Sequence, residues 1–205
     1  ATVPNDFRSK TSRAARALLP LLADKDSEVR AQAAKVLGDT HAWKAFDGLV
    51  KLLSDESPRP RFFAAIALGK LGRKEAVAPI LAMLRANADT DVYLRHAGVM
   101  GLVGTADKSA LLSAAKDNSS AVRMGVLLAM RRLQLPEVAQ FLHDADPLLV
   151  VEAARAINDL PVNEAMPQLA ALIDTPTDSE PLLRRVLNAN FRLGYSETAM
   201  SLTRF

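Results

Sequence analysis

A short segment that recurs six times is the feature that most constrains the fold of this 205-residue chain. Each copy has an Asp, a second marker residue six positions later, and small or apolar residues three, four or seven positions after that, as in Asp24–Gly38. The marker is Arg in five copies, and the marker positions are 31, 34, 28, 27 and 34 residues apart. The five pairs are Asp24 and Arg30, Asp55 and Arg61, Asp89 and Arg95, Asp117 and Arg123, and Asp178 and Arg184. The fifth copy instead pairs Asp144 with Val150.

Each copy predicts two helices. An apolar segment of helical period, such as Val77–Leu84, precedes the Asp, and a second helix with apolar residues at i, i+3, i+4 and i+7 follows it. No stretch alternates with a period of two, so no strand is expected. One helix pair cannot bury its apolar face alone, whereas stacked pairs can. The sequence therefore predicts an all-α fold, an α-solenoid of about six helix pairs plus a truncated seventh helix.

The repeats predict how the chain is organised. We expect an N-terminal extension over residues 1–10 and a solenoid over 11–205. Its expected repeats are 11–39, 40–72, 73–104, 105–134, 135–160 and 161–194, with a partial repeat at 195–205. The chain lacks an initiator Met, and a helix opening near Ser196 stops at Phe205, which predicts a fragment of a longer protein. Two separate helical bundles are a poorer interpretation, because no Pro, Gly and Ser-rich linker interrupts the repeat.

Composition excludes several kinds of site. The chain has no Cys, so disulfides, thiolate metal sites and covalently attached haem are ruled out. The longest apolar run, Ala76–Leu84, is too short to span a membrane. The formal net charge of +3 is too small to indicate nucleic-acid binding by itself.

Catalytic motifs are missing from the sequence. There is no Gly-x-Ser-x-Gly, no P-loop and no Gly-x-Gly-x-x-Gly. His41, His96 and His143 share no i, i+3 or i+4 relation and belong to no His-Glu-x-x-His motif. We therefore expect neither catalytic residues nor a metal or other cofactor, and we predict that the chain is not an enzyme.

The Asp turn, the Val-Arg pair and the Ala-Ala-x-x-Leu-Gly helix resemble HEAT repeats, especially the short bacterial type also seen in phycobilin lyases. The resemblance covers nearly the whole chain. In such repeats the turn Asp and the second-helix Arg stack into a ladder, which implies this structural role for all five Asp and Arg pairs given above. Val150 interrupts the ladder.

The second helices carry the most informative side chains. Positions one and five after the marker residue lie on one face, away from the Ala and Leu core. The resemblance to HEAT repeats implies that this face is the concave one. We call its central residues the second-helix strip: Phe62, Ile66, His96, Met100, Met124 and Leu128, with Phe63 and Val151 beside them. Either strong curvature buries the strip, or it is a groove that binds a partner.

We interpret the strip as a non-catalytic groove for a protein segment or for an adjoining domain of a longer parent protein, and we expect a monomer. One alternative is tetrapyrrole handling, as the likeness to bilin lyases implies. The other is a nucleic-acid-binding repair protein. Arg59, Arg61, Lys70, Arg73 and Lys74 form a local basic cluster, but a groove for nucleic acid would need more aromatic side chains.

A narrower resemblance concerns what surrounds the repeats. Arg61–Gly72 and Asp91–Gly98 resemble a HEAT module of large bacterial proteins that combine a sorbosone-dehydrogenase-like propeller with a c-type cytochrome domain. This likeness implies a location in the cell envelope or periplasm. The sequence itself indicates no compartment.

Overall fold

The computed structural model describes residues 15–105, 107–175 and 177–194. It divides into two compact units, Ala1–Leu111 (unit 1) and Leu112–Phe205 (unit 2), which are described separately below. The regular elements are α-helices and 3₁₀ helices, and the described residues contain no strand. The prediction of an all-α helical-repeat fold is confirmed. The predicted extension at 1–10 and the partial repeat at 195–205 lie outside the described residues.

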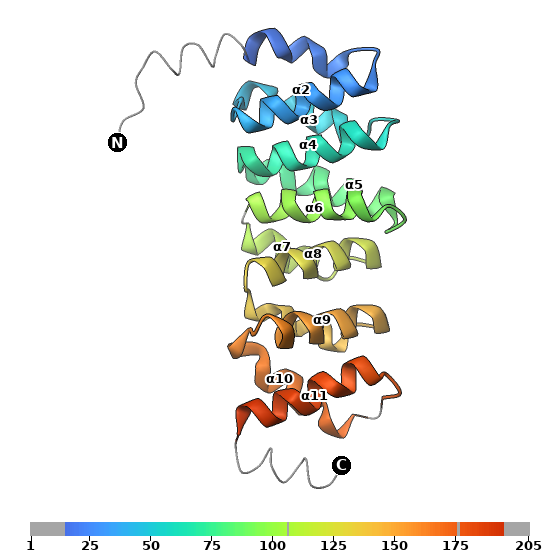
Figure 1. Cartoon of the computed structure of the whole chain (residues 1–205), viewed down its shortest axis with the longest axis vertical. Helices are drawn as coiled ribbons and strands as arrows, with labels where there is room; N and C mark the ends of the chain where they lie inside the picture. The colour runs from blue at the N-terminus through green and yellow to red at the C-terminus, as the bar shows by residue number, and fades with distance from the viewer. Residues whose placement is uncertain (1–14, 106, 176, 195–205) are drawn as a thin grey trace, which may run out of the picture. The chain divides into compact units, whose positions relative to one another are not determined.

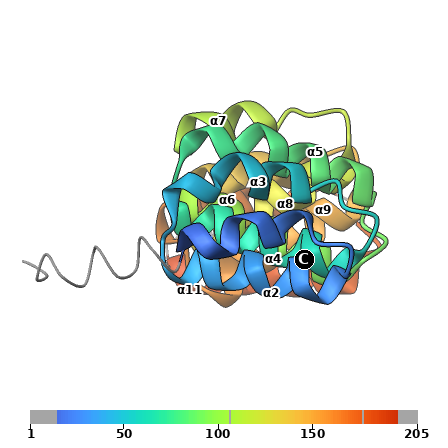
Figure 2. The same cartoon turned by 90° about the horizontal axis from the view of Figure 1, so that it is seen from above.

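Unit 1 consists of two layers of helices. After a helical turn at 15–18, its elements are η1 (Leu19–Ala23), α2 (Ser27–Asp39), η2 (Trp43–Ala45), α3 (Phe46–Leu52), α4 (Pro58–Leu71), η3 (Lys74–Ala76), α5 (Val77–Asn87), α6 (Val92–Thr105) and the start of α7 (Lys108–Ala114). The second helices α2, α4 and α6 lie side by side (Figure 1). The first helices α3 and α5 lie on the opposite side from α2 and α4 (Figure 2).

Glycines let the second helices of unit 1 approach closely. A Cβ on Gly101 would lie 2.9 Å from the carbonyl oxygen of Ala65, and one on Gly69 would lie 2.9 Å from the Cα of Gly101. A Cβ on Gly104 would clash directly with the backbone of Gly69. Residues on α4 therefore face those about one repeat later on α6.

Unit 2 has regular second helices and short first helices. Its elements are α8 (Ser120–Arg132), η4 (Pro136–His143), α9 (Pro147–Asp159), η5 (Asn163–Ala165), α10 (Met166–Ala170), η6 (Ala171–Asp174) and α11 (Glu180–Leu193). The first helix of the fifth repeat, η4, is wholly 3₁₀. Met130, Phe141 and Leu149 are almost fully buried and join α8, η4 and α9 into one core.

The acidic turns begin the second helices as the sequence predicts. The carboxylate of Asp26 accepts a hydrogen bond from the backbone N–H of Glu28 at 2.7 Å, and Asp146 accepts one from Leu148 at 3.0 Å. The ladder aspartates accept hydrogen bonds in the turn just before the second helix begins. Asp55 accepts from the backbone N–H of Ser57 at 2.9 Å and so closes the turn that leads into α4. These bonds satisfy N–H groups that a helix start leaves unpaired.

Candidate binding face

The Arg ladder links consecutive repeats where it is intact. Arg30 donates from Nε and from one Nη to the two carboxylate oxygens of Asp55, at 2.7 and 2.8 Å. Its other Nη donates to the carbonyl oxygen of Asp24 at 2.8 Å. The arginine of one repeat thus binds the turn aspartate of the next repeat and the turn backbone of its own. The hydrogen bond from Arg30 lowers the pKa of Asp55.

Unit 2 repeats this geometry. Arg123 donates to both carboxylate oxygens of Asp144, at 2.8 and 2.9 Å, and to the carbonyl oxygen of Asp117 at 2.8 Å. Burial is the largest single influence on the pKa of Asp144 and raises it. The hydrogen bond from Arg123, the hydrogen bond from the backbone of Asp146 and the charge of Arg123 together outweigh burial, so the pKa lies below its usual value. The side chains of Arg123 and Asp144 are only 15% and 8% exposed. We call such a pair, in which Nε and one Nη of an arginine bind the two oxygens of one carboxylate, a fork, and this fork is largely buried.

The ladder changes partner at the third repeat. Asp89 accepts two short hydrogen bonds from Nη1 of Arg95 in its own repeat, at 2.7 and 2.6 Å. Ala88 and Asp89 have left-handed backbone conformations, with φ of 46° and 61°. Among the described residues, the buried Nε of Arg61 has no hydrogen-bond partner. Asp89, which by analogy with Asp55 would bind Arg61, therefore binds Arg95 instead.

The last predicted pair departs from the ladder. Arg184 forms an ion pair with Glu180 on its own helix, 2.7 Å apart, and both side chains are more than 70% exposed. Asp178 is exposed as well. The sequence missed the pair that joins these repeats: Arg185 donates to both carboxylate oxygens of Asp159, at 3.1 and 2.8 Å. Arg185 directly follows the marker residue Arg184. The second arginine at this point in the sequence could have indicated that Arg185, and not Arg184, pairs with the preceding repeat.

A small apolar cavity lies where Val150 replaces the ladder arginine. It has a volume of about 80 Å³ and is lined by side chains of η4, α9, η6 and α11 and of the loop before α11. The lining residues are Leu142, His143, Val150, Leu172, Thr175, Thr177, Leu182, Leu183 and Val186. Valine is shorter than arginine and has no polar group, so it leaves this space between the repeats unfilled.

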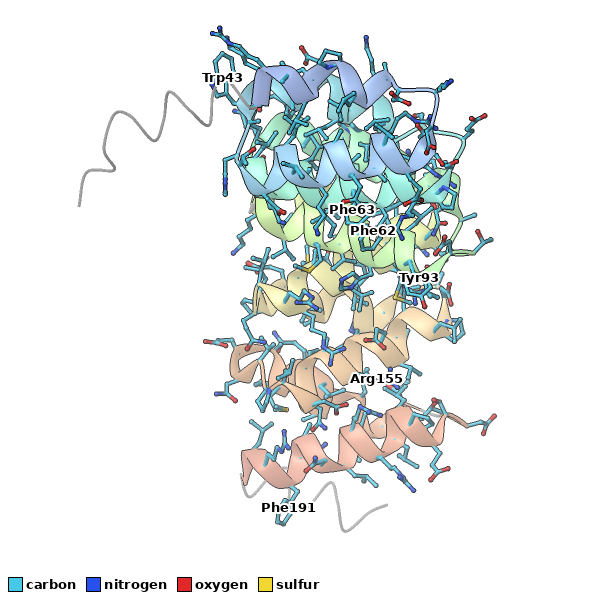
Figure 3. The ribbon with its side chains drawn as sticks, turned by 45° about the horizontal axis from the view of Figure 1, so that its top comes forward. Trp43, Phe62, Phe63, Tyr93, Arg155 and Phe191 are labelled. Carbon is cyan, nitrogen blue, oxygen red and sulfur yellow. The ribbon has the colours of Figure 1, made fainter. Side chains whose placement is uncertain are left out.

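The second-helix strip of unit 1 is partly exposed. Phe62, Ile66 and Met100 are half-buried and His96 is exposed, whereas Ala65 and Leu68 on the same helix as Phe62 are fully buried. Phe63, also half-buried, packs edge to face on Phe62 with ring centroids 5.2 Å apart. Figure 3 shows the two rings next to each other on α4, away from Trp43.

The strip residues of unit 2 have the same degree of exposure. Met124 and Leu128 on α8 and Val151 on α9 are all half-buried. Polar contacts border them: Glu152 accepts hydrogen bonds from Arg131 at 2.9 Å and from Arg155 at 3.0 Å. Each unit thus presents apolar side chains at the strip positions of its second helices.

The described residues offer few other candidates for a site. No three His, Asp or Glu side chains among them come together as metal ligands. In the same part of the chain, no helix is long and apolar enough to cross a membrane. An open apolar hollow of about 310 Å³ lies between η1 and α2, lined by Leu18, Leu21, Val29, Val36 and their neighbours.

The first three helix pairs match a known family. Residues 15–102 fit the family model described as HEAT repeats. The resemblance that the sequence suggested is therefore confirmed for this segment. Unit 2 contains further helix pairs. No curated protein matches the chain.

Two solved structures have folds similar to that of this chain. One is a chain of the complex of CpcE and CpcF of phycocyanin lyase from Nostoc sp. PCC7120, with 23% identity and a TM-score of 0.51; the match covers 91% of this chain and 79% of that one. The other is YibA from E. coli, with 18% identity and a TM-score of 0.50, covering 98% of this chain and 80% of that one. At these identities the likeness concerns the fold alone.

Proposed function

We propose that the chain is a non-catalytic binding module that holds an apolar protein segment against the second-helix strip. The observation that supports this proposal is the exposure of the strip. Phe62, Ile66 and Met100 remain half-exposed although they are large apolar side chains on helices whose neighbouring positions are fully buried. Contiguous apolar surface on a folded protein typically marks an interaction site.

The side chains suit a protein partner. Phe62 and Phe63 offer a rigid aromatic pair as an anchor, and Met100 adapts its shape to the side chain that it meets. Polar residues border the apolar positions, as in protein interfaces. The partner segment belongs either to another protein or to an adjoining domain of a longer chain.

Tetrapyrrole handling is the second candidate. It is favoured by the fold shared with the phycocyanin lyase complex and by the exposed His96 among the apolar residues of the second-helix strip. Titration with bilin or haem distinguishes the two candidates, because a bound pigment shifts its absorption spectrum and a His96→Ala variant would lose the shift. Nucleic acid is not favoured, because the strip is apolar and the exposed cations near it, Arg59 and Lys70, are paired with Glu28 and Asp39.

The test uses peptides selected on the wild-type protein from a phage library of random 12-residue sequences. We expect Phe62→Asp combined with Met100→Asp to abolish binding of these peptides while the far-UV circular dichroism stays unchanged. The matched control is Trp43→Asp, because Trp43 is an exposed aromatic residue outside the strip and its loss should leave binding intact. If the double variant unfolds, the strip is core. If it binds the peptides normally, they bind elsewhere. Either result contradicts the proposal.

A further inference from the structure

One ladder arginine lacks the partner that its counterparts have. Arg30 and Arg123 each place Nε and one Nη on the carboxylate of the next repeat. Arg61 occupies the same position on α4, yet its buried Nε bonds to nothing in the described part of the chain. A buried donor without an acceptor costs free energy, so an unpaired one calls for an explanation.

The neighbouring acids cannot complete the fork. Asp55 is near enough to interact electrostatically with Arg61, but both of its carboxylate oxygens already accept from Arg30. Asp89 is held by Arg95 through a turn with left-handed residues. Within the described residues Arg61 therefore lacks the hydrogen-bonded carboxylate that Arg30 and Arg123 each have.

The surroundings of Arg61 favour an anion from outside. Arg61 directly precedes Phe62 on α4 and so borders the strip of unit 1. Helix α4 carries three cations and no carboxylate. The other two, Arg59 and Lys70, are paired with Glu28 and Asp39, so Arg61 is the cation on this helix that lacks an ion pair within the described structure.

We infer that Arg61 binds a carboxylate of the partner segment, an Asp or Glu side chain next to the apolar residues that contact Phe62 and Phe63. This inference rests on the proposed function and specifies its ligand: an apolar segment with an acidic residue. A nucleic acid would need several unpaired cations along its phosphates, whereas the face of α4 supplies one. A single guanidinium matches a single carboxylate, which would meet its Nη groups because Nε is enclosed by the protein.

The test extends the phage selection. We expect the selected peptides to be enriched in Asp or Glu beside apolar residues. Arg61→Met should weaken their binding, measured by fluorescence anisotropy, by about 10- to 100-fold. Replacing the peptide's acid by its amide should cause the same loss on wild type and little on Arg61→Met. The matched control is Arg59→Met, which removes the same charge from an exposed site on the same helix and should change binding little.

A stability measurement separates a binding role from a structural one. Because Arg61 lacks its ladder bonds, Arg61→Met should leave the urea midpoint unchanged or raise it, while Arg123→Met should lower it. A fall as large as that of Arg123→Met would overturn the inference. So would peptides that depend on Phe62 and Met100 but show no acidic preference, a result that would leave the proposed function standing. Both proposals would be overturned if no peptides are selected, or if the binding of the selected peptides does not depend on the strip residues Phe62 and Met100.

Discussion

At the scale of single residues, the buried forks are the polar contacts with the largest expected effect on stability. Removing Arg123 leaves the carboxylate of Asp144, which is only 8% exposed, without its charged partner. We expect Arg123→Met to lower the free energy of unfolding by about 2–4 kcal/mol. Urea denaturation measures this loss. Arg184→Met is the control, since its exposed pair with Glu180 should contribute little. Equal shifts for the two variants would contradict the ladder.

The same forks predict how stability depends on pH. The hydrogen bond from Arg30 lowers the pKa of Asp55, so the folded state favours the ionised carboxylate. This contribution is fully present above the pKa of the unfolded chain, about 4, and is lost as pH falls through the lower folded pKa. We expect the urea midpoint to fall below about pH 4, and to fall less steeply in Asp55→Asn. An identical pH profile for the variant would refute this assignment.

Val150 allows a stabilising substitution. A longer apolar side chain at this position should fill part of the cavity of about 80 Å³ that Val150 lines. We expect Val150→Met to raise the free energy of unfolding by about 1 kcal/mol. Val151→Met, one residue away on the partly exposed strip, is the control and should have a smaller effect. A lower melting temperature for Val150→Met would show that the cavity cannot accept the side chain.

At the scale of helices, the contact between α4 and α6 depends on glycine. In an exposed helix, replacing Gly by Ala stabilises by about 1 kcal/mol. At Gly104 the added methyl group would clash with the backbone of Gly69, which cannot rotate away. We expect Gly104→Ala to destabilise unit 1 by about 1–3 kcal/mol in thermal unfolding.

Gly48 provides the matched control for this helix contact. A Cβ there would meet the terminal methyl of Leu22 at 2.7 Å, and that side chain can change rotamer. Gly48→Ala should therefore cost clearly less than Gly104→Ala. The reverse order would mean that the backbone contact between α4 and α6 relaxes more easily than a buried leucine.

At the scale of the whole molecule, stability should be local. Repeats of this kind contact mainly their neighbours, and the chain divides into two compact units. We expect Arg123→Met to raise amide hydrogen exchange within residues 112–194 and to leave residues 15–105 near wild type. Arg30→Met should show the opposite distribution. Uniform loss of protection across the chain in either variant would indicate a single cooperative unit instead.

The sequence by itself determined the elements and their order. The recurring Asp and apolar period place a helix start after each turn, and hydrogen bonds over two or three residues suffice to form it, as at Asp26 and Asp146. For the same reason the helix pairs and the absence of strands in the described residues could be predicted. The HEAT-repeat character came from the resemblance of the Asp turn and the second helix to that family. The choice of Phe62, Ile66 and Met100 as outward positions also followed from helical period alone.

Only the tertiary structure decided how the repeats use these residues. The partner of a ladder arginine depends on how the intervening turn places the next aspartate. Left-handed residues at Ala88 and Asp89 turn that carboxylate to Arg95 and leave Arg61 unpaired. The exposure of the strip and the cavity at Val150 depend on how closely helices pack, which is set by contacts between residues far apart in the chain. Sequence period fixes the direction of a side chain on its own helix, whereas its neighbours and exposure come from packing.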